Sequence, residues 1–271
     1  MALLRVAAVQ MNSDDDVAKN LAVVRARIAE AKAGGASFVL LPENFAFMGG
    51  TDEQRRDVAE ALDGDGPIVT TLRALAREHA LTLVGGGMPE RTGDPLRPHN
   101  TSIVIDPRGE VTARYRKIHL FDVEVGDGQT YRESAAVTAG DAPVVVPVPP
   151  FQVGLSVCYD LRFPELYRAL VDLGATLLTV PAAFTLMTGK DHWHVLLRAR
   201  AIESQCYVLA AAQWGKHPKG RQTYGKSLVV DPWGEVIAQA SEGEGLVFAD
   251  LDETRVTRVR ASLPSLRHRR L

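Results

Sequence analysis

Cys158 is the residue of this sequence best placed for covalent chemistry. It lies in the run Val153-Gly-Leu-Ser-Val-Cys-Tyr-Asp-Leu-Arg-Phe-Pro-Glu165, in which an apolar strand is followed by a helix that opens near Pro164. The carboxyl end of a strand is where α/β sheets place their ligands. Thiolate is the reactive form, and nearby cations or a helix N-terminus lower the thiol pKa from about 8.5. We therefore interpret Cys158 as a nucleophile and Cys206, which enters an apolar strand, as an inert core thiol.

A cysteine nucleophile needs a base and a group that stabilises an oxyanion. No histidine stands at an obvious strand end, so the pattern does not predict a Cys–His pair. Glu43 directly follows a buried strand in Leu40-Leu-Pro-Glu43, and Lys117 lies among apolar residues in Tyr115-Arg-Lys-Ile-His119. Taken singly, Glu43 could be an exposed loop acid and Lys117 a surface lysine whose stem covers apolar neighbours.

The elements that must position these residues belong to an internal sequence repeat. Four segments of the first half recur in the same order in the second half: 6–11 as 153–158, 35–42 as 174–181, 72–76 as 197–201, and 102–111 as 227–236. The offset between paired segments shrinks along the chain, which indicates extra loop residues in the first half. Glu43 falls opposite Ala182, so the repeated scaffold does not itself require an acid there.

Each copy has the pattern strand, helix, strand, helix, strand, hairpin. The first helix has an apolar stripe at helical spacing from Val17 to Ile28, an Asp cap before it and Gly34 after it. Alternating strands and helices imply mainly parallel sheets with helices outside. Two such halves stacked sheet on sheet predict an α/β fold, a four-layer α-β-β-α sandwich with an internal pseudo-twofold repeat, in a single domain covering 1–271.

Composition excludes several classes of protein. The chain has 46% apolar residues, 24% charged residues and a net charge of −2, which is ordinary for a globular protein and argues against a nucleic-acid binder. No apolar run approaches the roughly 18 residues that span a bilayer, and the start lacks signal-peptide features. Two cysteines make no disulfide framework, so we expect a cytoplasmic protein. The basic tail 267–270 is either a solvated terminus or an anchor to a partner subunit.

Two weaker motifs do not support a cofactor or a metal. The run Gly220-Arg-Gln-Thr-Tyr-Gly-Lys-Ser227 fits a phosphate-loop pattern, but a strand rather than a helix should follow it. His192 and His194 are two residues apart, which places them on different faces of the expected helix. We therefore expect neither a cofactor nor a bound metal.

Glu43, Lys117 and Cys158, with their flanking residues, resemble the Glu-Lys-Cys triad of the nitrilase superfamily. Glu133, in Tyr-Arg-Glu-Ser, is similar to the second glutamate that this family carries between its lysine and cysteine. The resemblance runs over nearly the whole chain, from about residue 4 to residue 270. It implies an α-β-β-α sandwich, hydrolysis of a carbon–nitrogen bond without a cofactor, and a homodimer or higher homo-oligomer.

The resemblance also implies a mechanism. The Cys158 thiolate would attack the amide carbonyl with Glu43 as general base, while Lys117 and the backbone N–H of Tyr159 would hold the oxyanion. Glu43 would then protonate the leaving amine and activate water against the thioester, and Glu133 would orient Lys117 or the substrate. The alternative is a non-catalytic binding protein on the same fold, but such a protein could have lost any of these residues.

The stretches 181–189 and 192–208 resemble two branches of this family. The run Ile202 to Tyr207 and the region of Gln213 favour the branch that hydrolyses deaminated glutathione to 2-oxoglutarate and cysteinylglycine. The ω-amidase branch, which acts on 2-oxoglutaramate or 2-oxosuccinamate, is similar over Thr188-Gly189 and His192-Trp193. The family resemblance therefore implies a small-molecule amide substrate, with a 2-oxo diacid as its acyl part.

Three further residues could bind this substrate. Phe184 and Thr185 follow a strand end and could line the pocket, although loop packing would also explain them. Arg162 lies just after the nucleophile, and its planar fork suits a substrate carboxylate. The alternative for Arg162 is a structural ion pair with Asp160, Glu165 or a partner subunit.

Overall fold

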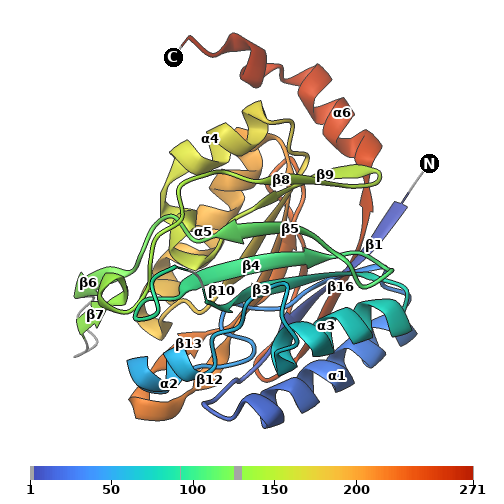
Figure 1. Cartoon of the computed structure of the whole chain (residues 1–271). Coiled ribbons are helices and arrows are strands. Elements are labelled where there is room, and N and C mark those ends of the chain that lie inside the picture. The colour runs from blue at the N-terminus through green and yellow to red at the C-terminus, as the bar shows by residue number, and fades with distance from the viewer. Residues whose placement is uncertain (1–2, 92, 125–129, 271) are drawn as a thin grey trace.

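A computed structural model of the chain describes residues 3–91, 93–124 and 130–270. Two six-stranded sheets are stacked face to face, and helices cover their outer faces (Figure 1). The first sheet has the order β16-β1-β2-β3-β4-β5. Its strands are β1 (Leu3–Gln10), β2 (Phe38–Leu40), β3 (Thr82–Glu90), β4 (His99–Ile105), β5 (Val111–Arg116) and β16 (Gly245–Asp252). The helices α1 (Val17–Ala33) and α3 (Pro67–Glu78) cover its outer face.

The second sheet has the order β15-β14-β11-β10-β9-β8. Its strands are β8 (Val145–Val148), β9 (Phe151–Leu155), β10 (Leu177–Ala182), β11 (Tyr207–Ala212), β14 (Leu228–Val230) and β15 (Val236–Gln239). The helices α4 (Pro164–Asp172) and α5 (Leu186–Ser204) cover its outer face (Figure 1). The predicted four-layer α-β-β-α sandwich is confirmed.

The internal repeat is also confirmed. The first copy is β1-α1-β2-α3-β3-β4-β5, and the second is β9-α4-β10-α5-β11-β14-β15. In each copy the first three strands are parallel and the last two form an antiparallel hairpin. The sequence did not predict the edge strands β16 and β8, each of which pairs antiparallel with the first strand of a copy. Because these edge strands lie outside the repeated segments, internal matching could not reveal them.

Several elements are insertions into this repeated scaffold. They are α2 (Asp52–Asp57), β6 (Asp122–Glu124), β7 (Thr130–Arg132), β12 (Trp214–Lys216) and β13 (Gln222–Tyr224). Figure 1 shows α2, the β6–β7 hairpin and the β12–β13 hairpin gathered at one end of the sandwich. The helix α6 (Glu253–Ser262) follows β16 near the C-terminus. Short 3₁₀ turns are η1 (Glu133–Ala135), η2 (Cys158–Arg162), η3 (Pro218–Gly220) and η4 (Ser265–His268).

Local chemistry explains where the elements begin and end. Asp16 caps α1 by accepting a hydrogen bond from the Lys19 N–H at 3.0 Å, which satisfies an otherwise unpaired donor of the first turn. Pro67 and Pro164 are the first residues of α3 and α4, where the missing N–H costs nothing. The β4–β5 hairpin turns through Gly109, whose φ of +81° favours glycine.

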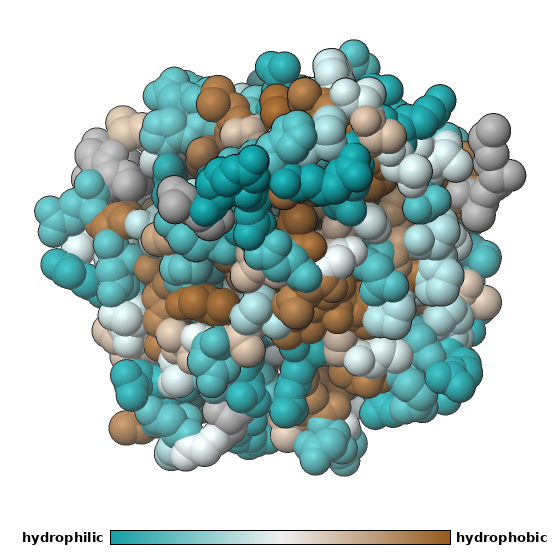
Figure 2. All heavy atoms as spheres, turned by 90° about the horizontal axis from the view of Figure 1, so that it is seen from above, coloured by the Kyte–Doolittle hydropathy of each residue, from teal (hydrophilic) through white to brown (hydrophobic). Residues whose placement is uncertain are grey.

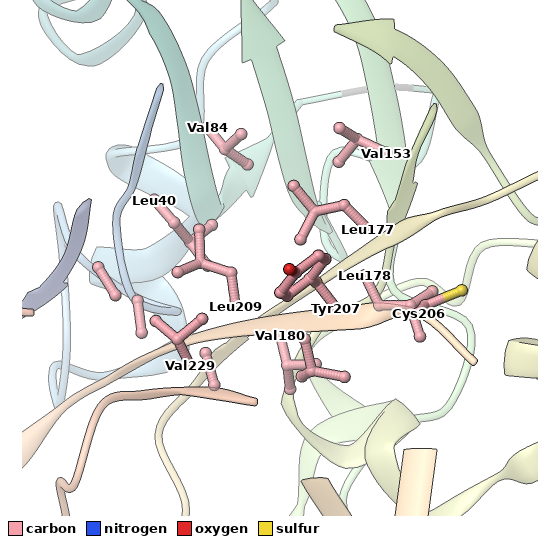
Figure 3. Packing of buried hydrophobic residues seen from close by; sticks show 14 of the residues in the cluster. Leu40, Val84, Val153, Leu177, Leu178, Val180, Cys206, Tyr207, Leu209 and Val229 are labelled. Carbon is pink, nitrogen blue, oxygen red and sulfur yellow. The ribbon is translucent and has the colours of Figure 1, made fainter. Parts of the chain in front are cut away.

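The core lies mainly between the two sheets. Figure 3 shows Leu40 and Val84 of the first sheet near Val153, Leu177 and Leu209 of the second. A second buried cluster fills the space between the first sheet and the helices α1 and α3. Burying this apolar surface is what holds four layers together without staples, since both cysteines are free thiols.

The molecular surface is mixed in character. In Figure 2, hydrophobic side chains are interspersed among hydrophilic ones on the face seen from above. Among the described residues, none of the helices combines the length and the apolar character needed to cross a membrane.

Candidate active site

Glu43 and Lys117 lie at the same edge of the first sheet. Glu43 follows β2, and Lys117 directly follows β5. The strand β5 runs parallel to β2 because two antiparallel reversals, β3 to β4 and β4 to β5, restore the direction of the chain. Both side chains are only 2% exposed. The alternatives of a loop acid and a surface lysine are therefore wrong.

Cys158 reaches this edge from the second sheet, just after β9. The corresponding edges of the two sheets meet, since the Trp214 N–H after β11 donates to the carbonyl of Met11 after β1 at 2.8 Å. The Cys158 thiol lies beside the Glu43 carboxylate, and each group shifts the pKa of the other. The structure thus brings together the Glu, Lys and Cys that the sequence singled out, one from the second repeat and two from the first.

Lys117 is the centre of a buried ionic cluster. Its Nζ lies 3.0 Å from Glu43 Oε1 and 3.0 and 2.8 Å from the two carboxylate oxygens of Glu133. Asn100 Nδ2 also donates to Glu43 Oε1 at 2.9 Å, and the Phe121 N–H donates to Glu133 Oε2 at 2.7 Å. These contacts hold the two carboxylates on either side of the ammonium group, which has three N–H donors in all.

Cys158 sits in a strained turn between strand and helix. Its φ of +51° lies in the left-handed region, which costs a non-glycine residue about 1 kcal/mol. Buried Asp160 holds this turn by accepting hydrogen bonds from the Val157 N–H and the Tyr115 hydroxyl, both at 2.8 Å. Its other oxygen binds His119 through the ring Nδ1 at 2.7 Å and the backbone N–H at 3.1 Å. Asp160 therefore ties the Cys158 turn to the segment that carries Lys117.

Electrostatics in the cluster favour a charged base and a neutral thiol. Burial by itself would raise the pKa of Glu43, but Lys117 and the neighbouring Cys158 outweigh it and hold the pKa below its usual value. Burial and the neighbouring Glu43 raise the pKa of Cys158 well above its ordinary range, and Lys117 only partly opposes them. The directions of these pKa shifts favour a protonated thiol rather than the thiolate that the sequence suggested.

A cavity of about 330 Å³ opens above these groups. Its walls include Cys158, Tyr159, Phe184 and Thr185. Phe184 packs on Trp193 with ring centroids 5.0 Å apart. Thr185 caps α5, accepting a hydrogen bond from the Thr188 N–H at 3.3 Å. Phe184 and Thr185 thus combine a packing role with a place in the cavity wall.

Arg162 also lines the cavity, and its guanidinium lies 5.4 Å from the ring centre of Phe184. Its Nη1 is 3.3 Å from His192 Nδ1. Among the described residues Arg162 makes no ion pair: Asp160 is fully engaged elsewhere and Glu165 is exposed. An ion pair with the described residues therefore does not explain Arg162.

Other expectations and omissions follow from the same geometry. His192 and His194 have different partners, Arg162 and Gln239, and no metal-binding cluster occurs within the described ranges. The phosphate-loop pattern ends at β14 rather than at a helix, as predicted. Sequence reasoning missed Asn100 and Asp160, whose only signal is a polar side chain beside an apolar strand. It also missed three cavity arginines in the insertions, Arg55, Arg132 and Arg221.

Comparison with known proteins agrees with this site. The family model described as carbon-nitrogen hydrolase matches residues 5–261. A protein from Synechocystis sp. named deaminated glutathione amidase is 46% identical over 269 residues, covering 97% of each chain.

Two solved structures share the fold. The NitFhit protein of C. elegans has a TM-score of 0.93 and 43% identity; the match covers 100% of this chain and 66% of that one. An amidase of the nitrilase superfamily from Nesterenkonia sp. AN1, with an acetamide moiety added at its active-site cysteine, has a TM-score of 0.80 and 30% identity over 97% of this chain and 95% of that one. With its sandwich fold and its buried Glu, Lys and Cys, the chain belongs to the carbon–nitrogen hydrolase family and is a hydrolase of the nitrilase superfamily.

Proposed function

We propose that this protein is an amidase that hydrolyses deaminated glutathione to 2-oxoglutarate and cysteinylglycine. The observation that carries the mechanism is the buried cluster in which the Cys158 thiol and Glu43 interact directly, with Lys117 Nζ 3.0 Å from Glu43 Oε1. A non-catalytic binding protein would have no need of a buried base joined to a buried thiol. The names of similar proteins support the choice of substrate.

The reaction follows from the cluster. As the sulfur of Cys158 bonds to the amide carbonyl carbon, its proton passes to Glu43, and the Lys117 ammonium and the Tyr159 N–H stabilise the oxyanion. Glu43 then gives the proton to the amine as the carbon–nitrogen bond breaks, which leaves a thioester on Cys158. Water attacks the thioester while Glu43 takes its proton, and the carboxylic acid leaves as the thiol is restored. Glu133 holds Lys117 in position throughout.

The charge of the cavity supports a dianionic substrate. The described lining residues include five cationic side chains against three anionic ones. Deaminated glutathione carries one carboxylate on its 2-oxo acyl part and one at the end of cysteinylglycine. The ω-amidase substrates carry only one carboxylate, so the excess of positive charge disfavours that alternative. Arg162, which lies beside Phe184 and the nucleophile, would bind the carboxylate of the acyl part.

The test compares purified protein on deaminated glutathione and on 2-oxoglutaramate, with separate measurement of the 2-oxo acid and the released amine. We expect a higher kcat/KM for deaminated glutathione and none with Cys158→Ala. A preference for 2-oxoglutaramate would instead assign the ω-amidase reaction. Arg162→Lys should lower kcat/KM for carboxylate-bearing substrates far more than for neutral amides, and equal loss on both would remove Arg162 from the acyl site.

We also propose a homodimer or higher oligomer in a reducing compartment such as the cytoplasm. The nucleophile must stay a free thiol, which supports the compartment. Val195, Ile202 and Trp233 are 67%, 47% and 51% exposed and supply an apolar face for a second copy. The basic tail supports it less, because Arg269 binds Asp172 of its own chain at 2.8 Å. A monomer by light scattering at micromolar concentration would contradict the oligomer.

A further inference from the structure

Three arginines in the cavity wall have no part in the mechanism above, and one of them, Arg132, lies 3.8 Å from the Glu124 carboxylate. The other two are Arg55 and Arg221. Arg55 belongs to α2, and Arg221 lies between η3 and β13. Both segments are insertions, so the repeated scaffold does not require either side chain for its own packing. Within the described part of the chain neither residue makes an ion pair, and the side chain of Arg55 makes no hydrogen bond.

Arg221 is held at the cavity by neutral groups. Its Nη2 donates to the carbonyl of Ala183 at 2.9 Å, and its guanidinium lies 5.7 Å from the ring centre of Tyr131. Its Nε is buried without a hydrogen-bond partner. The backbone of Ala183 also lies beside the Cys158 thiol and acts to lower its pKa. Ala183 thus connects Arg221 to Cys158. The Nε of Arg221 remains an unsatisfied donor close to the nucleophile.

The positive charges of the Arg55 and Arg221 guanidinium groups repel each other. Burial lowers the pKa of Arg55, and the neighbouring Arg221 lowers it further, while Glu133 and Glu43 oppose the shift. Those two carboxylates are already bound by Lys117. The remaining carboxylate of the described cavity wall, Asp52, also opposes the shift, but it is exposed and forms no ion pair among the described residues. Desolvating the two cations is therefore costly. A bound carboxylate would compensate both and could accept two parallel hydrogen bonds from either fork.

We propose that Arg55 and Arg221 form a second anion subsite, which binds the carboxylate of the leaving amine. This inference rests on the proposed function and deepens it. Arg162 takes the carboxylate of the acyl part, and the Arg55–Arg221 pair takes the carboxylate at the end of the dipeptide. The enzyme would thus select amides whose amine part ends in a carboxylate over amides that release ammonia or a neutral amine.

The test uses two matched substrates, deaminated glutathione and the same compound with its glycine carboxylate converted to a carboxamide. Wild-type protein should show a kcat/KM higher for the acid on the order of 10- to 100-fold, the range expected for hydrogen bonds to a charged group. In Arg55→Gln and Arg221→Gln the ratio of kcat/KM for the acid to that for the carboxamide should fall towards one, because activity on the acid drops more. Arg162→Gln is the matched control, and it should lower kcat/KM for both substrates by the same factor.

The outcomes separate the two proposals. If wild-type protein hydrolyses both substrates equally well, the subsite is refuted and the amidase function stands. If it hydrolyses neither, the proposed function fails and the subsite with it. A preference that survives both substitutions but disappears in Arg162→Gln would assign the subsite to Arg162 and overturn the proposal. The wild-type comparison needs no variant, and Arg55→Lys and Arg221→Lys, which keep the charge but lose the fork, should retain part of the preference.

Discussion

Replacing Lys117 by Met tests whether the buried ionic cluster works as a unit. The substitution keeps an apolar side chain of similar length but removes three hydrogen bonds, of 3.0, 3.0 and 2.8 Å, to Glu43 and Glu133. Removing one partner of a buried ion pair costs about 3–5 kcal/mol, because the remaining charge is uncompensated. We expect the free energy of unfolding to fall by this amount at pH 8. Loss of an oxyanion donor should lower kcat by about 10²–10³.

The loss of stability should depend on pH. Without Lys117, burial dominates and the pKa of Glu43 rises above its ordinary value of about 4.3. Below the raised pKa the native state of the variant binds a proton that the unfolded state releases, so the destabilisation is greatest at high pH and shrinks as pH falls towards about 4.3. The stability that the variant recovers through protonation of Glu43 is limited to about 1.4 kcal/mol per pH unit.

Urea unfolding at pH 8 and pH 5.5 measures both effects. The matched control is Lys117→Met combined with Glu133→Gln, which removes one of the two opposed charges and should recover at least about 1 kcal/mol at pH 8. A deficit that is the same at both pH values, or a double variant no more stable than the single one, would refute the idea that Lys117 compensates buried negative charge.

Three further predictions concern the turn and the buried polar groups. Glu43→Gln should lower kcat by about 10²–10⁴ with the fold intact, and a loss of only a few-fold would place Glu43 outside proton transfer. Cys158→Gly should be at least as stable to heat as Cys158→Ala, because glycine adopts the φ of +51° without strain. Elsewhere glycine is usually less stabilising than alanine by about 0.5–1 kcal/mol. The same order at position 158 would contradict backbone strain there. Burial lowers the pKa of His217 to about 4, where its ring donates to the Ser13 carbonyl. Between about 6.5 and 4 only the unfolded state binds the proton, so stability falls as pH falls, by up to about 3 kcal/mol. Melting temperatures of His217→Asn should vary less with pH over this range, and an unchanged slope would exclude His217 as the cause.

Much of the scaffold could be predicted from the sequence, because it depends on short-range chemistry. The stripe from Val17 to Ile28, the cap at Asp16 and the prolines that open α3 and α4 act over a few residues, and each is where the pattern predicted it. The repeat could be found because two copies of one plan keep similar residues at matching positions. Glu43, Lys117 and Cys158 could be selected because each stands at a strand end, and their placement in one cluster is confirmed.

What the tertiary structure decided depends on contacts between distant segments. The pKa shift of Cys158 favours a protonated thiol because burial and Glu43, more than 100 positions earlier in the chain, outweigh Lys117. Asp160 connects the turn to distant partners, Tyr115 and His119, and the edge strands β8 and β16 have no internal copy to reveal them. Arg55 and Arg221 become cavity residues because two unrelated insertions fold to the same end of the sandwich. Local periodicity carries no information about such meetings, since they are set by how the two sheets stack.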